Sequence, residues 1–229
     1  MAYSMLNPAQ KKLTFIFWLL AFMDITGILI NNEILLYIVK PLLIPALFLL
    51  LFNTDAAVPG KKILLTGLFF SWMGDVFLLL ESTYALFFLF GLASFLTTHV
   101  FYIIYFLGIQ SDNGSFLKKR PISLALVLAY GIILVWQLFP FLGELKIPVI
   151  IYAAVICSML ICSLHIFLKV NRKSAGYYLI GAATFVLSDS LLAINKFYQP
   201  FAYAGVFIML TYCAAQYFIV RGFIQLEKK

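Results

Sequence analysis

Long apolar runs separated by short polar segments dominate the sequence. Each run is close to the ~20 residues that an α-helix needs to cross a bilayer. Lys11 and Lys12 precede the first run and no small-residue cleavage site follows it, so we expect a retained helix rather than a signal peptide. The pattern predicts an all-α membrane protein, a single integral membrane domain over residues 1–229. Its eight transmembrane helices are expected at about 13–30, 34–52, 62–80, 85–107, 121–140, 147–168, 176–197 and 201–220.

The amino-acid composition supports this class. Of the 229 residues, 64% are hydrophobic and only 11% are charged, whereas a soluble domain has roughly half and about a quarter. This balance excludes an ordinary soluble enzyme and a disordered chain. The net charge of +7 comes from short Lys and Arg clusters between apolar runs. No extended basic stripe exists, so we expect membrane lipids and no nucleic acid as partners.

The positions of the basic residues predict an orientation. With the N-terminus in the cytoplasm, only Lys146 and Lys196 fall on the outer side, and Lys40 falls within a helix. Because cytoplasmic loops carry an excess of Lys and Arg, this alternation predicts that both termini are cytoplasmic. The short loops suit a multi-pass protein of a bacterial inner membrane. The cytoplasmic residues are Lys11, Lys12, Lys61, Lys62, Lys118, Lys119, Arg120, Lys169, Arg172, Lys173, Arg221, Lys228 and Lys229.

Ionisable residues inside the predicted helices are the first candidates for chemistry. They are Asp24, Lys40, Asp75 and Asp189, with His99 as a fifth. A charge in the bilayer core costs a few kcal/mol or more, so each needs a partner or a function. At about 1.5 Å rise per residue, Lys40, Asp75 and Asp189 fall in one layer, roughly 20 Å from the cytoplasmic surface.

Asp75 and Asp189 also share a local pattern. Each follows a glycine by eight residues and precedes a leucine by three, and their predicted helices run in the same direction. The match indicates a possible parallel repeat of four plus four helices. The matching residues are Gly67, Asp75 and Leu78, and Gly181, Asp189 and Leu192.

Polar neighbours suggest how these carboxyl groups are supported. Ser71 lies one helical turn before Asp75, on the same face. For each neighbour alone, a hydrogen bond between helices is the simpler interpretation. One structural Asp–Lys40 pair would leave another carboxylate unexplained, which favours a function for Asp75 and Asp189. The other polar neighbours are His99, Tyr102, Asn195, Tyr212 and Gln216.

No metal or cofactor site is expected. His99 and His165 belong to no cluster with the spacing of metal ligands, and the three cysteines lie within apolar runs without a CxxC motif. No glycine loop for phosphate and no nucleophile elbow is present. A set of two aspartates and a lysine suits acid–base chemistry without a metal, and equally proton-coupled transport.

Short motifs follow one another in a characteristic order between residues 35 and 222. Taken together they resemble the YhhN-like family of membrane proteins, which includes the lysoplasmalogenases. The first helix matches least well. The motifs are Lys40-Pro41, Gly74-Asp75-x-x-Leu78, Gly91-x-x-Ser94-Phe95, His99-x-x-Tyr102, Gly181-Ala182, Phe185, Ser188-Asp189-Ser190, Tyr212-x-x-Ala215-Gln216 and Val220-Arg221-Gly222.

The resemblance implies a hydrolase of the vinyl-ether bond of lysoplasmalogens, with a lysophospholipid as substrate. The products would be a fatty aldehyde and glycerophosphoethanolamine or glycerophosphocholine. The reaction protonates the β-carbon of the vinyl ether, and water captures the resulting oxocarbenium ion. Two carboxyl groups in different environments can divide the acid and base roles.

We therefore expect Asp75 and Asp189 to be catalytic, with Lys40 keeping one of them ionised or orienting it. Which aspartate is the acid stays open. The remaining candidates would shape the pocket or bind the headgroup. They are His99, Tyr102, Tyr212 and Gln216, then Ser71, Asn195 and Asp24.

Three other functions remain open at this stage. A small proton-coupled transporter would use the same buried charges. A hydrolase of another lysolipid or ether lipid would differ only in pocket shape. A structural scaffold would tolerate loss of Asp75. Headgroup and chain specificity, the leaflet of entry and the oligomeric state also stay open.

Overall fold

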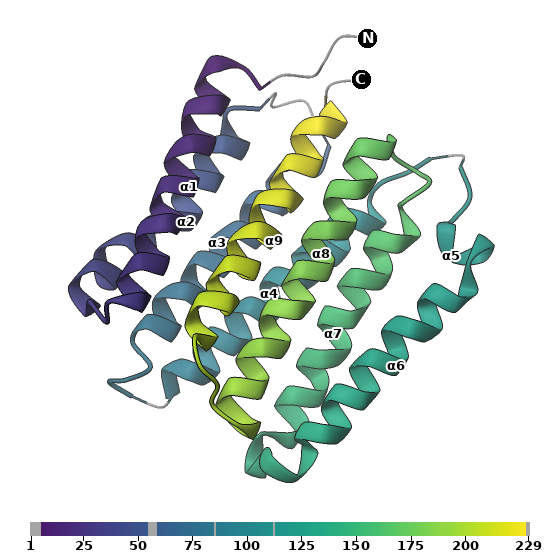
Figure 1. Cartoon of the computed structure of the whole chain (residues 1–229). Helices are drawn as coiled ribbons and strands as arrows, with labels where there is room; N and C mark the ends of the chain where they lie inside the picture. Colours follow the sequence, from purple (N-terminus) through teal and green to yellow (C-terminus); the bar gives the residue numbers. More distant parts are fainter. Residues whose placement is uncertain (1–5, 55–58, 85, 112, 228–229) are drawn as a thin grey trace. The chain divides into compact units, whose positions relative to one another are not determined.

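The computed structural model describes residues 6–54, 59–84, 86–111 and 113–227. Within these ranges eight helices are long and apolar enough to cross a membrane, which confirms the predicted all-α membrane class (Figure 1). A short helix, α5 (Phe116–Lys119), precedes the fifth of them. The eight are α1 (Pro8–Leu29), α2 (Glu33–Phe52), α3 (Lys61–Leu79), α4 (Leu86–Leu107), α6 (Pro121–Leu138), α7 (Lys146–His165), α8 (Arg172–Ala193) and α9 (Ala204–Glu227).

The helix ends differ from the predicted ones where capping, not hydrophobicity, decides them. Asn7 caps α1: its Oδ1 accepts from the Gln10 N–H at 2.7 Å, and Gln10 Oε1 accepts from the Asn7 N–H at 3.1 Å. This capping box starts α1 at Pro8 instead of at about residue 13. α9 continues to Glu227, because a charge such as Arg221 ends an apolar run without ending a helix. The predicted first residue of the fourth helix, Ala85, lies outside the described residues, as do Lys228 and Lys229.

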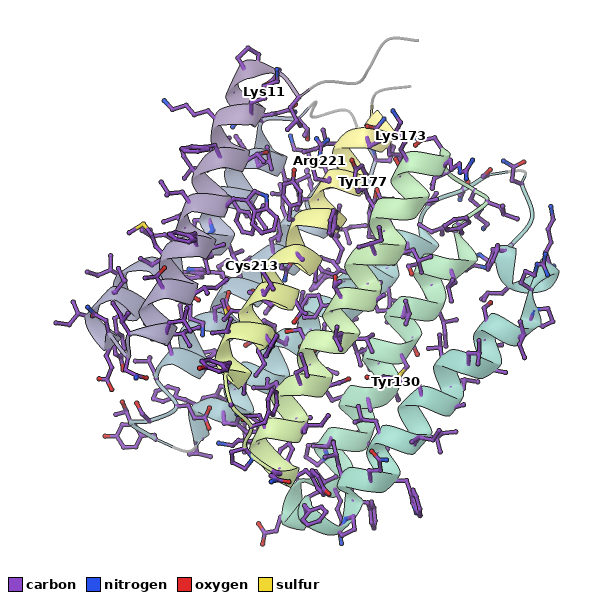
Figure 2. All side chains as sticks on the ribbon, viewed as in Figure 1. Lys11, Tyr130, Lys173, Tyr177, Cys213 and Arg221 are labelled. Atoms are coloured by element: carbon purple, nitrogen blue, oxygen red, sulfur yellow. The ribbon has the colours of Figure 1, made fainter. Side chains whose placement is uncertain are left out.

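The chain divides into two compact units, each described by itself. The first comprises Met1–Tyr105 and Val220–Lys229, and the second comprises Phe106–Ile219. Among the described residues, the Lys and Arg predicted to face the cytoplasm lie near helix ends or in the connections beside them. In the first unit, Lys11 near the start of α1 and Arg221 near the end of α9 illustrate this (Figure 2).

In the first unit, α1 packs on α2 and α2 packs on α3. Helix α2 contains Pro41 and Pro45 yet stays continuous. Pro45 has no N–H to donate to the carbonyl of Pro41, four residues earlier. The indole Nε1–H of Trp72 on α3 donates to that carbonyl instead, at 2.9 Å. The proline segment that follows Lys40 is thereby attached to α3.

Two glycines allow α3 and α4 to approach closely. A Cβ atom at Gly67 would lie 2.6 Å from the Tyr102 ring, and one at Gly74 would lie 2.7 Å from the Phe95 ring. The Thr98 hydroxyl also donates to the carbonyl of Gly67, at 3.1 Å. These contacts set the face of α3 that carries Asp75 against α4.

In the second unit, α7 packs between α6 and α8. Gly181 brings α8 against α9, since a Cβ there would lie 3.0 Å from the carbonyl oxygen of Ala215. The rings of Phe185 on α8 and Tyr212 on α9 also meet in T-shaped contact, with 5.7 Å between their centroids. Gly67 on α3 and Gly181 on α8 hold equivalent positions in the shared sequence pattern. Each of them faces the next long helix along the chain.

The helix bounds agree with the predicted four-plus-four repeat. A shift of 114 residues relates Asp75 to Asp189 and Gly67 to Gly181. The same shift brings the starts of α1, α2, α3 and α4 to within four residues of the starts of α6, α7, α8 and α9.

Candidate functional site

Asp189 lies on α8 in contact with a tyrosine from α7. The Tyr152 hydroxyl donates a hydrogen bond of 2.5 Å to Asp189 Oδ2. Tyr152 is buried, whereas Asp189 is half-buried. The carboxyl group therefore has a fixed donor on one oxygen while part of its side chain stays accessible.

A second tyrosine holds the next residue of α8. The Tyr130 hydroxyl, midway along α6 (Figure 2), donates to Ser190 Oγ at 2.8 Å. The Ser190 hydroxyl in turn donates to the carbonyl of Val186 at 2.6 Å. Two consecutive residues of α8 are thus bound by tyrosines of two different helices. Neither tyrosine was predicted from the sequence, because spacing within one helix does not reveal a partner on another.

The other candidates of the second unit have different surroundings. Tyr212 and Gln216 of α9 are buried. Asn195 lies in the π-helical segment Ile194–Tyr198 that follows α8, and its side-chain oxygen accepts from the Phe201 N–H at 3.4 Å. This bond ties the α8–α9 connection together, which is a structural contact.

Four candidates of the first unit gather where α3 meets α4; we call them the α3–α4 cluster. They are Ser71, Asp75, His99 and Tyr102, all of them buried, with Asp75 only 2% exposed. The contacts of Gly67 with Tyr102 and of Gly74 with Phe95 set an antiparallel register between the helices. In that register Ser71 stands opposite Thr98, next to His99, one helical turn from Asp75.

Asp24 and Lys40 form a separate pair between α1 and α2. Asp24 is fully buried, and neither carboxyl oxygen has a hydrogen-bond partner among the described residues. It interacts electrostatically with Lys40, which is half-buried. Lys40 was expected to orient Asp75 or Asp189. That role stays a prediction.

The predicted catalytic pair divides between the two units, Asp75 in the first and Asp189 in the second. Its joint action stays a prediction. Across the described residues, no group of three or more His, Cys, Asp and Glu side chains could hold a metal ion.

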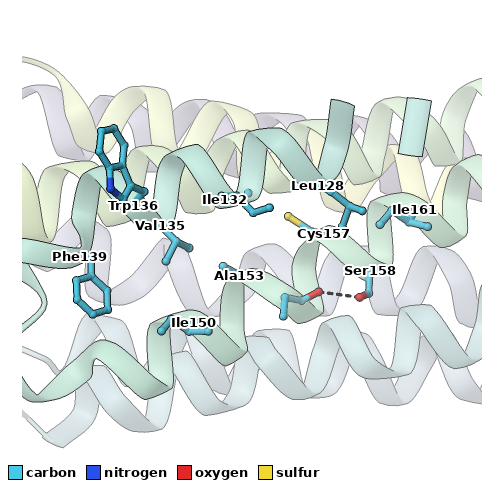
Figure 3. Close-up of a pocket in the computed structure, with 12 residues that line it drawn as sticks. Leu128, Ile132, Val135, Trp136, Phe139, Ile150, Ala153, Cys157, Ser158 and Ile161 are labelled. Atoms are coloured by element: carbon cyan, nitrogen blue, oxygen red, sulfur yellow. Dashed lines mark hydrogen bonds between the residues drawn. The ribbon is translucent and has the colours of Figure 1, made fainter. Parts of the chain in front are cut away.

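An apolar groove of about 620 Å³ lies between α6 and α7 (Figure 3). Its one hydroxyl, that of Ser158, donates to the carbonyl of Ala154 at 2.7 Å, so the groove presents almost only carbon. Tyr152 lies about half a turn from Ala154 and faces away from the groove. The groove is therefore separate from Asp189. Its lining is Leu128, Gly131, Ile132, Val135, Trp136, Phe139, Ile150, Ala153, Ala154, Cys157, Ser158 and Ile161.

Comparison with known proteins places the chain in a family. The model of the YhhN family matches residues 35–223. A lysoplasmalogenase of Mycobacterium bovis is 30% identical over 138 residues, 59% of this chain and 51% of that protein. The human lysoplasmalogenase TMEM86B is 34% identical over 130 residues, 56% of this chain and 50% of that protein. The chain thus spans about half the length of these two relatives.

A third relative is matched over more of its length. The lysoplasmalogenase TMEM86B of Sus scrofa is 31% identical over 182 residues, 80% of this chain and 72% of that protein. No solved structure matches the chain. The interval matched by the family model contains α3, α4, α6, α7 and α8 and most of α2 and α9, but not α1. The protein therefore belongs to the YhhN family.

Proposed function

We propose that this protein is a lysoplasmalogenase, a membrane hydrolase that cleaves the vinyl-ether bond of lysoplasmalogens. The products are a fatty aldehyde and glycerophosphoethanolamine or glycerophosphocholine. The observation that carries the proposal is the family match over residues 35–223, together with relatives named lysoplasmalogenase. That interval includes both Asp75 and Asp189.

The two aspartates suit this reaction. An acid protonates the β-carbon of the vinyl ether, and the positive charge spreads between the α-carbon and the ether oxygen. Water then adds to the α-carbon and gives up a proton to a base, as in glycoside hydrolysis through an oxocarbenium ion. The resulting hemiacetal breaks into aldehyde and alcohol. One carboxylic acid and one carboxylate are sufficient for every proton transfer.

We assign these roles to Asp75 and Asp189 together. Both lie within helices long enough to cross a membrane, where a carboxyl group without a function is costly. Their shared sequence context supports a shared function. Lys40, Asp24 and the polar residues Tyr212 and Gln216 are proposed as supporting groups, together with the remaining members of the α3–α4 cluster.

The surroundings of the substrate follow from its chemistry. A lysophospholipid has one chain and a charged headgroup, so it reaches membrane helices by way of the bilayer. We propose that the protein resides in a bacterial inner membrane with both termini in the cytoplasm. The distribution of Lys and Arg along the chain supports this orientation.

Aldehyde release tests the proposal. Protein purified in detergent is incubated with lysoplasmenylethanolamine, with the ester-linked lysolipid of the same headgroup as the control. Aldehyde from the vinyl ether, and no cleavage of the ester, is the expected result. Cleavage of a different ether lipid instead would identify that lipid, and not lysoplasmalogen, as the substrate. No cleavage by folded protein, combined with proton-coupled uptake in vesicles, would favour a transporter.

A further inference from the structure

Asp189 and Tyr152 meet in the second unit through one short hydrogen bond. The Tyr152 hydroxyl is the donor and Asp189 Oδ2 the acceptor, at 2.5 Å. The bond holds one oxygen of the Asp189 carboxyl group against α7.

The direction of the bond has a chemical consequence. An ionised carboxylate is an acceptor only, whereas a protonated one must also place its own proton. A hydroxyl that donates to a carboxyl group favours the ionised form of that group. Tyr152 is buried on α7, and its bond to Asp189 joins α7 to α8.

We infer that Tyr152 is a positioning residue that keeps Asp189 ionised and oriented, and that Asp189 is the base which takes a proton from the attacking water. The inference rests on the proposed function. Asp75, only 2% exposed, is then the acid. This assigns the two roles that the sequence analysis left open.

The proton transfers balance with these roles. Asp75 gives its proton to the β-carbon and becomes ionised. Water adds to the α-carbon, and its proton goes to Asp189. When the hemiacetal breaks, Asp189 gives that proton to the departing ether oxygen, while the hemiacetal hydroxyl returns a proton to Asp75. Both groups end in their starting states, and no further reactant is required.

The chain offers a matched control one residue away. Tyr130 donates to Ser190 much as Tyr152 donates to Asp189, at 2.8 Å, but no carboxyl group is involved. Replacing either tyrosine by phenylalanine removes one hydroxyl and one hydrogen bond between helices. A purely structural role predicts similar consequences for the two substitutions.

Steady-state aldehyde release from wild-type protein, Tyr152→Phe and Tyr130→Phe tests the inference. We expect kcat to fall on the order of 100-fold in Tyr152→Phe, the scale of a small misplacement of a catalytic group. KM should change little, because a bond that acts on the transition state affects kcat. Tyr130→Phe should keep nearly wild-type kcat. Equal losses in the two variants, or none in folded Tyr152→Phe, would overturn the inference.

Infrared spectroscopy supplies a readout that does not depend on turnover. Subtracting the spectrum of Asp189→Asn from that of wild type isolates the bands of Asp189. Carboxylate bands at neutral pH, shifted in Tyr152→Phe and unshifted in Tyr130→Phe, are the expected result. A protonated carboxyl band in wild type would overturn the inference even if aldehyde is formed. If no aldehyde is formed, the proposed function and the base role both fail, while the infrared result still decides whether Tyr152 keeps Asp189 ionised.

Discussion

The indole N–H of Trp72 donates to the carbonyl of Pro41, which α2 leaves without its usual donor because Pro45 stands four residues later. Inside a bilayer no water can donate a hydrogen bond to such a carbonyl, so the donor must come from a side chain of a neighbouring helix. This contact explains how α2 keeps two prolines near its middle and remains one helix.

Trp72→Phe should therefore lower stability. We expect the free energy of unfolding to fall by about 1 kcal/mol, the usual value of one hydrogen bond between membrane helices. Denaturation with SDS in mixed micelles measures it. In a Pro45→Ala background the substituted residue supplies its own backbone N–H to the Pro41 carbonyl, so Trp72→Phe should cost less there. An equal loss in both backgrounds would show that ring packing alone is responsible.

Replacement of either proposed catalytic aspartate should abolish most turnover. Asp75→Asn and Asp189→Asn keep the side-chain size but cannot exchange protons, and loss of a general acid or base lowers the rate by about 10²–10⁴-fold. Aldehyde release by folded protein is the measurement. Thr97→Val is the control, because the Thr97 hydroxyl donates to the carbonyl of Ala93 in its own helix, at 2.8 Å. Full turnover in one Asn variant would remove that aspartate from the mechanism.

Gly74 should be sensitive to the smallest enlargement. A Cβ atom there would stand 2.7 Å from the Phe95 ring, so Gly74→Ala must displace α4 or the ring. Overpacking of this kind costs about 1–3 kcal/mol. Gly176→Ala is the matched substitution, with nothing within 4 Å of the added atom, and helix propensity should make it neutral or stabilising. Thermal denaturation in detergent compares the two variants.

The Asp24–Lys40 pair should show strong coupling. Lys40→Met removes the cation that interacts with buried Asp24, and we expect a loss of about 1–3 kcal/mol, below the value for a fully buried pair because Lys40 is half-buried. Replacing both residues, as Asp24→Leu with Lys40→Met, removes the buried charge as well. The double variant should recover much of the stability in SDS titrations. Additive losses would show that the two residues act independently.

Hydrophobic patterning was sufficient to predict the eight long helices, since helix length and apolar content follow directly from bilayer thickness. It also singled out Asp24 and Asp75, which the structure places in the protein interior. It could not predict the start of α1, because a capping box is local hydrogen bonding rather than hydrophobicity. The short helix α5 was missed for a similar reason, as four polar and apolar residues form no run.

By itself, the sequence determined the helical class, the number of long helices and which ionisable groups the membrane-spanning segments contain. These properties depend on residues that are neighbours along the chain. Only the tertiary structure decided that Tyr152 donates a hydrogen bond to Asp189 and that Trp72 donates one to the carbonyl of Pro41. Each of these contacts joins two helices. Each contact depends on how the helices are rotated and packed against each other, which the residue pattern within one helix does not predict.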